Sequence, residues 1–192
     1  MAKIKEKYWL NAEQAAFIVI DVQEKLVPAM DQELYGKVEQ NLPLLMEGCQ
    51  ALNVPIIVTE QYPKGLGHTV PTLVSTAQQP RVEKVAFSCC GESAFLTELK
   101  KTGATQVLIG GMETHVCVLQ TVIDLLDKGF EVHLVSDAVS SRFKGDYANA
   151  LRLMEQAGAV ITTTEIALFQ MVKVAGGEQF KTVSRLVRQR VK

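Results

Sequence analysis

Short apolar runs that alternate with amphipathic stretches are the feature that most constrains the fold of this chain. Most of the runs are rich in β-branched side chains and do not alternate with polar residues, which is typical of strands covered on both faces. The run at 82–87 differs because Glu83 and Lys84 interrupt it. The six runs lie at 16–20, 54–59, 82–87, 106–109, 131–135 and 159–163.

The stretches between these runs predict helices that cover a sheet. Their apolar residues recur at helical spacing, and Gly103, Gly129 and Gly158 follow three of them, where glycine commonly ends a helix. The first stretch, 34–49, contains Pro43, which we expect to kink the helix or restart it. The alternation predicts an α/β protein with three α/β/α layers and a mainly parallel, Rossmann-like sheet of about six strands.

The length of 192 residues favours a single domain, 1–192, with its core at about 12–172. A last helix is expected at about 177–191. Its apolar stripe either docks on this chain or packs against a second copy, and docking is favoured because such stripes usually belong to the core. The stripe comprises Phe180, Val183, Leu186, Val187 and Val191.

Composition excludes several classes of protein. The formal net charge of −1 argues against a general nucleic-acid binder, and the basic tail at 181–192 is better explained as a solvated helix face than as a phosphate site. No apolar run approaches the roughly 18 residues of a membrane span. The segment 1–10 has no apolar signal stretch. We therefore expect a cytoplasmic protein that acts on a small molecule, without nucleic-acid or membrane partners.

In an open parallel sheet, ligands bind beyond the carboxyl ends of the strands, where the strand order reverses. Several polar segments are expected at this edge. They are Asp21, 60–61, 88–90, 111–117 and 136–137.

Cys117 lies in a predicted turn from strand to helix at 110–118. The first turn of a helix favours a thiolate, and its backbone N–H groups can hold an oxyanion. The alternative is a buried core cysteine, which is how we interpret Cys49 in its helix stripe. Cys89 and Cys90 are intermediate, and nothing in the sequence pairs them with a base. The four cysteines have neither zinc-finger nor Cys-x-x-Cys spacing, so they are expected to stay thiols in a reducing compartment.

Asp21 and Lys84 are the other candidates at this edge. Asp21 follows five apolar residues, so poor solvation should raise its pKa toward the range of a general base, although a helix N-cap is the alternative. Lys84 needs a carboxylate partner or a function unless it points to water from an edge strand. His115 is two residues from Cys117, a spacing that does not face it on a helix. His115 is therefore interpreted as a structural or substrate-contacting residue.

Three motifs in this order resemble the isochorismatase-like cysteine hydrolases. The resemblance covers about 16–164, and the combination is specific although each motif alone is weak. The motifs are Asp-Val-Gln at 21–23, Lys84 with Phe-Ser at 87–88, and Gly-Met-Glu-Thr-His-Val-Cys-Val at 111–118. The segment 59–67, with 168–170 and 180–181, is most similar to the isochorismatase domain-containing proteins.

This resemblance implies an Asp-Lys-Cys triad. Asp21 would accept the thiol proton of Cys117, the nucleophile, and Lys84 would hold the thiolate and orient the carboxylate. The family also has a non-proline cis peptide before the cysteine, here Met112–Glu113, which would aim N–H groups at the oxyanion. Candidate substrate contacts are Gln23, Gln61, Tyr62 and His115.

The chain departs from the metal-dependent relatives, such as nicotinamidases, which carry Asp-x-His after the second strand and a further His. Here 60–62 reads Glu-Gln-Tyr, and the nearest imidazole is His68. A three-ligand site with an open position therefore lacks its ligands. We expect no zinc and no other cofactor, and nicotinamide hydrolysis is disfavoured.

The favoured function is a metal-independent hydrolase that cleaves an amide-type C–N bond. Family members that hydrolyse the vinyl ether of isochorismate rely on the Asp, so the presence of Cys117 favours acyl chemistry. Vinyl-ether hydrolysis and an idle binding protein remain alternatives. A nucleotide-binding Rossmann protein ranks last, since no Gly-x-Gly-x-x-Gly follows the first strand. By analogy with the family we expect a homo-oligomer, for which the tail helix could supply an interface.

Overall fold

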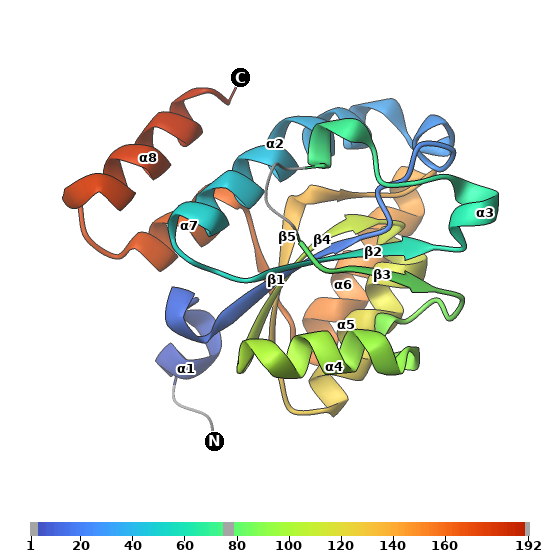
Figure 1. Ribbon diagram of the computed structural model, residues 1–192, viewed down its shortest axis with the longest axis horizontal. Coiled ribbons are helices and arrows are strands. Elements are labelled where there is room, and N and C mark those ends of the chain that lie inside the picture. Colours follow the sequence, from blue (N-terminus) through green and yellow to red (C-terminus); the bar gives the residue numbers. More distant parts are fainter. Residues whose placement is uncertain (1–3, 75–78, 191–192) are drawn as a thin grey trace.

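The computed structural model describes residues 4–74 and 79–190, and Figure 1 shows a central sheet between two layers of helices. The six strands of the described ranges are parallel and follow the order β3-β2-β1-β4-β5-β6. They are β1 (Ala15–Ile20), β2 (Ile56–Gln61), β3 (Arg81–Lys84), β4 (Gln106–Met112), β5 (Glu131–Ser140) and β6 (Val160–Thr162). The predicted α/β class and parallel sheet are confirmed.

Each face of the sheet has its own hydrophobic core, because successive side chains of a strand point to opposite faces. Phe17 and Val19 of β1 face one core, while Ile18 and Ile20 face the other. In Figure 1 the first core is covered by α2 (Gln32–Ala51), α7 (Thr164–Val172) and α8 (Gly177–Arg188). The second is covered by α4 (Ser93–Thr102), α5 (Leu119–Asp127) and α6 (Lys144–Ala157).

Short helical segments complete the described chain. The α-helical ones are α1 (Ile4–Tyr8) and α3 (Pro63–Leu66). Single turns occur at η1 (Ala12–Gln14), η2 (Val27–Ala29), η3 (Pro71–Leu73), η4 (Cys89–Gly91) and η5 (Thr114–Val118), of which η5 is a π-helical turn.

The strand order reverses between β1 and β4. The chain runs from β1 outward to β2 and β3, and then returns to place β4 on the other side of β1. In such a sheet the crevice at the carboxyl ends of these two strands is the usual ligand site. Asp21 follows β1 directly, and η5 with Cys117 follows β4.

Several strands end at other places than the sequence predicts. β2 continues to Gln61 and β4 to Met112, so 60–61 and 111–112 lie inside strands and not beyond them. β5 continues to Ser140, so 136–137 lies inside a strand and not beyond it, because β5 pairs again with the end of β4 after a register shift. β3 ends at Lys84 and not at Phe87. The backbone N–H groups of Val85 and Ala86 turn to the carboxylate of Glu92, at 2.9 and 3.2 Å, and so leave the sheet.

Of the two alternatives predicted at Pro43, a kink or a restart of the helix, the restart is wrong. Helix α2 runs through Pro43 from Gln32 to Ala51. Proline removes one backbone hydrogen bond inside a helix. The adjacent Leu42 and the nearby Leu45 are fully buried in the core, and their packing offsets that loss.

The tail helix docks on this chain, as predicted. Helix α8 packs against α2 and α7 and buries Val183 and Leu186, so the centre of its apolar stripe is covered within the chain. Val191, the last residue of the predicted stripe, lies outside the described residues.

Three basic side chains of the tail pair with acidic residues. Lys181 is 2.7 Å from Glu178, and Arg185 is 2.6 Å from Glu47. Arg190 bonds Asp137 at 2.7 Å. These pairs agree with the interpretation of the tail as a solvated helix face. None of the helices within 4–74 and 79–190 is long and apolar enough to cross a membrane.

Gly111 allows β4 to approach β1 closely. Its φ is +124°, and a Cβ atom would lie 2.1 Å from the carbonyl oxygen of Ile20. We predict that Gly111→Ala lowers the free energy of unfolding by about 3 kcal/mol or more, because neither backbone can move away within the sheet. Urea unfolding followed by circular dichroism measures this loss.

Gly36 provides the matched control. It lies inside α2, and no heavy atom lies within 4 Å of a Cβ built there. Gly36→Ala should raise stability by about 0.5–1 kcal/mol, because alanine loses less backbone entropy in a helix. Equal effects of the two substitutions would contradict the assigned packing of Gly111.

Candidate active site

A buried ion pair lies at the carboxyl edge of the sheet. Nζ of Lys84, at the end of β3, is 2.7 Å from Oδ2 of Asp21, which follows β1. Both side chains are 0% exposed. The alternative of an edge-strand lysine that points to water is therefore wrong. Asp21 is not a helix N-cap either, because the next helical turn begins at Val27 with Leu26 as its cap.

The ammonium group of Lys84 is surrounded by acceptors. Oε1 of Gln61 lies at 2.6 Å, and the carbonyl oxygens of Phe87 and Ala86 lie at 3.0 and 3.2 Å. Burial alone would lower the pKa of Lys84, but the Asp21 carboxylate and neighbouring thiols outweigh it, so the pKa is raised. Lys84 therefore keeps its charge, and its N–H donors are occupied by protein groups.

Asp21 is held by β2 through backbone and side chain. Its N–H donates to the carbonyl oxygen of Thr59 at 3.2 Å, and Oγ1 of Thr59 donates to Oδ1 at 2.7 Å. Asp21 has a φ of +52°, in the left-handed region that Asp tolerates better than most residues. Burial raises the pKa of Asp21 more than Lys84 and Thr59 lower it. The direction agrees with the raised pKa that the sequence predicts for Asp21.

Cys117 lies in η5, the π-helical turn between β4 and α5, and is 6% exposed. Its thiol lies near enough to the carboxylate of Asp21 for that charge to act on its pKa. The expectation that the helix start favours a thiolate is not met. Burial and the Asp21 carboxylate raise the pKa of Cys117 to about 12, against the opposite effect of Lys84. The resting thiol is therefore protonated and adjacent to a carboxyl group.

The loop before Cys117 contains the Met112–Glu113 bond, which is cis. Met112 is fully buried, and the carboxylate of Glu113 accepts from Arg142, at 3.0 Å from Nε and 3.3 Å from the backbone N–H. Segment 141–143, after β5, is thereby attached to the loop.

The four candidate substrate contacts lie in different surroundings. Gln23 is buried, and its amide bonds the backbone of Gln61 and Gly67. The side-chain oxygen of Gln61 accepts a hydrogen bond from Lys84. Nδ1 of His115 is 3.0 Å from Oγ of Ser141, so this ring is attached to the segment after β5.

Tyr62 is 54% exposed. It is the one of the four that lines a cavity beside Lys84, with a volume of about 370 Å³. The other lining residues are Pro63, Lys64, Glu83, Val85 and Glu92.

Sequence reasoning missed the residues that support this cluster. Oγ1 of Thr121, in α5, donates to the carbonyl oxygen of Cys117 at 2.6 Å and accepts from the N–H of Cys89 at 2.9 Å. Glu92 shapes the loop that offers carbonyl oxygens to Lys84. The sequence places Thr59 at the end of a strand and in a segment typical of the family, and it indicates no contact of Thr59 with Asp21. The one available signal was a polar residue within a buried run.

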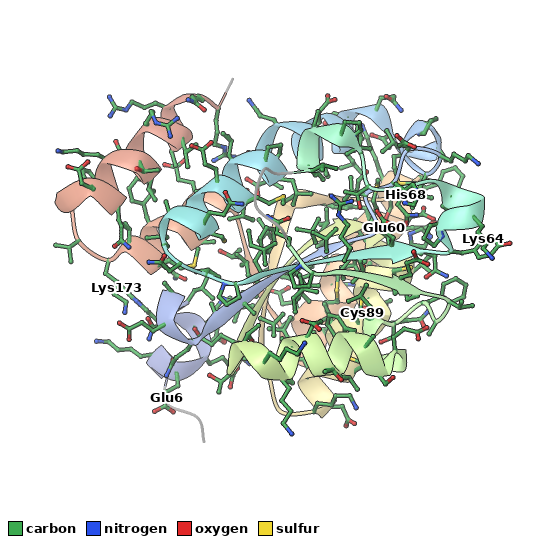
Figure 2. The ribbon with its side chains drawn as sticks, viewed as in Figure 1. Glu6, Glu60, Lys64, His68, Cys89 and Lys173 are labelled. Carbon is green, nitrogen blue, oxygen red and sulfur yellow. The ribbon has the colours of Figure 1, made fainter. Side chains whose placement is uncertain are left out.

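Glu60 and His68 lie on the other face of the sheet from Cys89, near α3 in Figure 2. The Glu60 carboxylate accepts from the N–H and Oγ1 of Thr69, both at 2.7 Å, and lies 3.0 Å from Nδ1 of His68. Burial would raise the pKa of Glu60, but these bonds outweigh it and lower it. Among the residues that the structure describes, no group of three or more His, Cys, Asp or Glu side chains could hold a metal ion.

The fold and this edge define an α/β protein with a polar cluster at the switch point of a parallel sheet. The chain belongs to the isochorismatase family, since residues 15–166 match the isochorismatase domain. Isochorismatase family protein 1B of Dictyostelium discoideum is 41% identical, over 93% of this chain and 88% of that protein. Isochorismatase domain-containing protein 2 of Danio rerio is 40% identical, over 93% and 89%.

A solved structure of the MAR1 ribonuclease from Caenorhabditis elegans has the same architecture. It superposes with a TM-score of 0.88 at 40% identity and covers 94% of this chain and 93% of that one. The resemblance inferred from the sequence motifs is therefore confirmed.

Removing the ammonium group should expose the cost of burying Asp21. We predict that Lys84→Met lowers the free energy of unfolding by about 3–5 kcal/mol at pH 8, because an unpaired carboxylate is left inside the protein. The folded pKa of Asp21 then lies further above its unfolded value. The variant therefore loses stability as the pH rises from the pKa of Asp21 in the unfolded chain to its higher pKa in the folded protein. The loss should accordingly be smaller at pH 5 than at pH 8. Urea unfolding at both pH values measures it.

The double variant Asp21→Asn/Lys84→Met is the control, since it removes both charges. It should be more stable at pH 8 than Lys84→Met alone. A loss that is identical at both pH values, or a double variant that is less stable than the single one, would contradict the buried pair.

Proposed function

We propose that this protein is a metal-independent hydrolase that cleaves an amide-type C–N bond in a small molecule, with Cys117 as nucleophile. The observation that carries the proposal is the buried pair of Asp21 and Lys84, 2.7 Å apart, whose carboxylate also acts on the pKa of the Cys117 thiol. A nucleophile, a base and a fixed positive charge therefore meet at one point, as thiol-based acyl transfer requires.

The first step joins proton transfer to attack. The raised pKa of Cys117 keeps the thiol protonated, so Asp21 accepts its proton while the sulfur bonds to the carbonyl carbon. The carbonyl electron pair moves to oxygen, where the N–H groups of Glu113 and Cys117 receive the charge. Because burial raises the pKa of Asp21, its carboxylate is a stronger base than an exposed one.

The second step breaks the C–N bond. Asp21 returns the proton to the leaving nitrogen as the oxyanion collapses, which gives an amine and a thioester on Cys117. Water then attacks the thioester, Asp21 accepts the water proton, and the departing sulfur recovers it. Lys84 acts through its charge alone in both steps, because its N–H donors already bind Asp21, Gln61 and backbone carbonyls.

Burial supports a small substrate. Asp21 and Lys84 are fully covered and Cys117 is 6% exposed, so only a slender group can reach the sulfur. The chain's similarity to the Caenorhabditis elegans MAR1 ribonuclease makes RNA the polymer to compare in any substrate panel.

We also propose a cytoplasmic homo-oligomer. All four cysteines are free thiols, which a reducing compartment maintains. The apolar stripe of α8 is largely used within the chain. The exposed apolar residues Ile123, Phe143 and Leu153 are therefore the better candidates for a contact between copies.

Cys117→Ala should lower the rate of turnover by several orders of magnitude, because the nucleophile and the base act as one unit. The measurement is release of amine from a panel of small amides, with a vinyl ether and an RNA oligonucleotide included. Cys90→Ala, a change at a half-buried thiol outside the cluster, should leave the rate unchanged. Activity that survives Cys117→Ala would refute the assigned nucleophile.

Alkylation by iodoacetamide separates an assembled site from an idle one without any substrate. At pH 7, Cys117 should react faster than Cys49 and Cys89, which are fully buried, and Asp21→Asn should remove this advantage. Uniformly slow reaction of all four thiols would instead favour the binding protein.

A further inference from the structure

Thr59 is a buried hydroxyl next to the candidate base. It lies in β2, opposite Ile20 of β1 and Val82 of β3, and is fully covered. We propose that Thr59 is a positioning residue that fixes the orientation of the Asp21 carboxylate and favours its ionised form. This inference rests on the proposed function, since it assigns Thr59 a role through Asp21.

Thr59 forms two hydrogen bonds with Asp21. The backbone carbonyl of Thr59 accepts the N–H of Asp21 at 3.2 Å, and Oγ1 donates to Oδ1 at 2.7 Å. The terminal torsion of an aspartate is otherwise broad and roughly two-fold. With Oδ1 bound to Thr59, Oδ2 is turned toward Lys84, at 2.7 Å.

Cys89 determines which way the hydroxyl donates. Its Sγ lies 3.8 Å from Oγ1 of Thr59, with the thiol as donor. Cys89 is fully buried, and burial raises its pKa to about 12, so it keeps the proton that it donates. A threonine hydroxyl has one hydrogen, and with Cys89 on its acceptor side that hydrogen points to Asp21.

The turn that carries Cys89 also contacts the nucleophile's segment. The N–H of Cys89 donates to Oγ1 of Thr121, which in turn donates to the carbonyl oxygen of Cys117. Figure 2 marks Cys89 on the opposite side of the sheet from Glu60, the side that α4 and α5 cover. The η4 turn therefore contacts the residues that bind both candidate groups. It reaches Asp21 through Thr59 and the backbone of Cys117 through Thr121.

Removal of the Thr59 hydroxyl should raise the pKa of Asp21. A hydrogen bond to a carboxylate stabilises the ionised form and lowers the pKa. Without the hydroxyl, Asp21 stays protonated to a higher pH, and fewer molecules can accept the proton of Cys117. A role confined to packing would not move a pH profile.

The test compares Thr59→Val, which keeps the shape and removes the hydroxyl, with Thr59→Ser, which keeps it. The rate of alkylation of Cys117 by iodoacetamide is followed against pH by peptide mass spectrometry. The rate should rise with pH over the range in which Asp21 loses its proton, here called the acid limb. In Thr59→Val the acid limb should lie about one pH unit higher, so that the rate at a given pH within it is about tenfold slower. Thr59→Ser should restore the wild-type profile, and in turnover kcat should fall with KM nearly unchanged.

Thr162→Val is the matched control. Thr162 is also a buried strand threonine, in β6, and its Oγ1 has no hydrogen-bond partner among the described residues. This substitution should leave the profile of Cys117 unchanged. An equal shift in Thr162→Val would show a general effect of threonine loss and would overturn the inference.

The outcomes separate this inference from the proposed function. If wild-type Cys117 shows no selective, Asp21-dependent alkylation, the proposed function fails. If it does, but the profile of Thr59→Val coincides with the wild type, only the role of Thr59 is refuted. If Thr59→Val does not fold, Cys89→Ala serves instead, because loss of the thiol frees the hydroxyl to turn away. It should shift the limb upward, and an unchanged or lowered limb contradicts the inference.

Discussion

The buried ion pair between Asp21 and Lys84 is the interaction on which the rest of the edge depends. Two charges removed from water are costly, and they persist only where other polar groups complete their bonding. Here Gln61 and two carbonyl oxygens accept hydrogen bonds from the ammonium group of Lys84, and the Thr59 hydroxyl donates one to the carboxylate of Asp21. The pair thus requires three neighbouring strands to end at matching heights, which the parallel register of β1, β2 and β3 provides.

The same arrangement sets the chemistry that the edge can perform. Burial raises the pKa of both Asp21 and Cys117, so neither group is charged as readily as it would be in water. A protonated thiol beside a basic carboxylate favours attack with simultaneous proton transfer over a stored thiolate. Lys84 supplies the positive charge that makes the anionic stages of such a reaction accessible. The cluster is therefore better described as one titrating unit than as separate residues.

Much of the fold was predictable because its signals are local. The apolar runs and glycine-ended helices identify the layers, and the positions of Asp21 and Cys117 after the first and fourth runs bring them to one edge. Lys84 lies inside its predicted run and reaches the same edge because β3 ends there. The supporting contacts were not predictable. Glu92 and Thr121 bond backbone groups of nearby segments through their side chains, and no sequence pattern shows which backbone groups lack a partner. Thr59 looks like any strand residue. The extension of β5 depends on a register shift with β4, which no local pattern encodes.

The most direct test of the buried pair is a titration of the Asp21 carboxyl carbon by ¹³C NMR, with Asp21→Asn to assign the signal. The account predicts a midpoint above the ordinary value of 3.8, which rises further in Lys84→Met because the opposing charge is lost. A midpoint at or below 3.8 that does not respond to Lys84 would contradict it, since the carboxylate would then be neither desolvated nor paired.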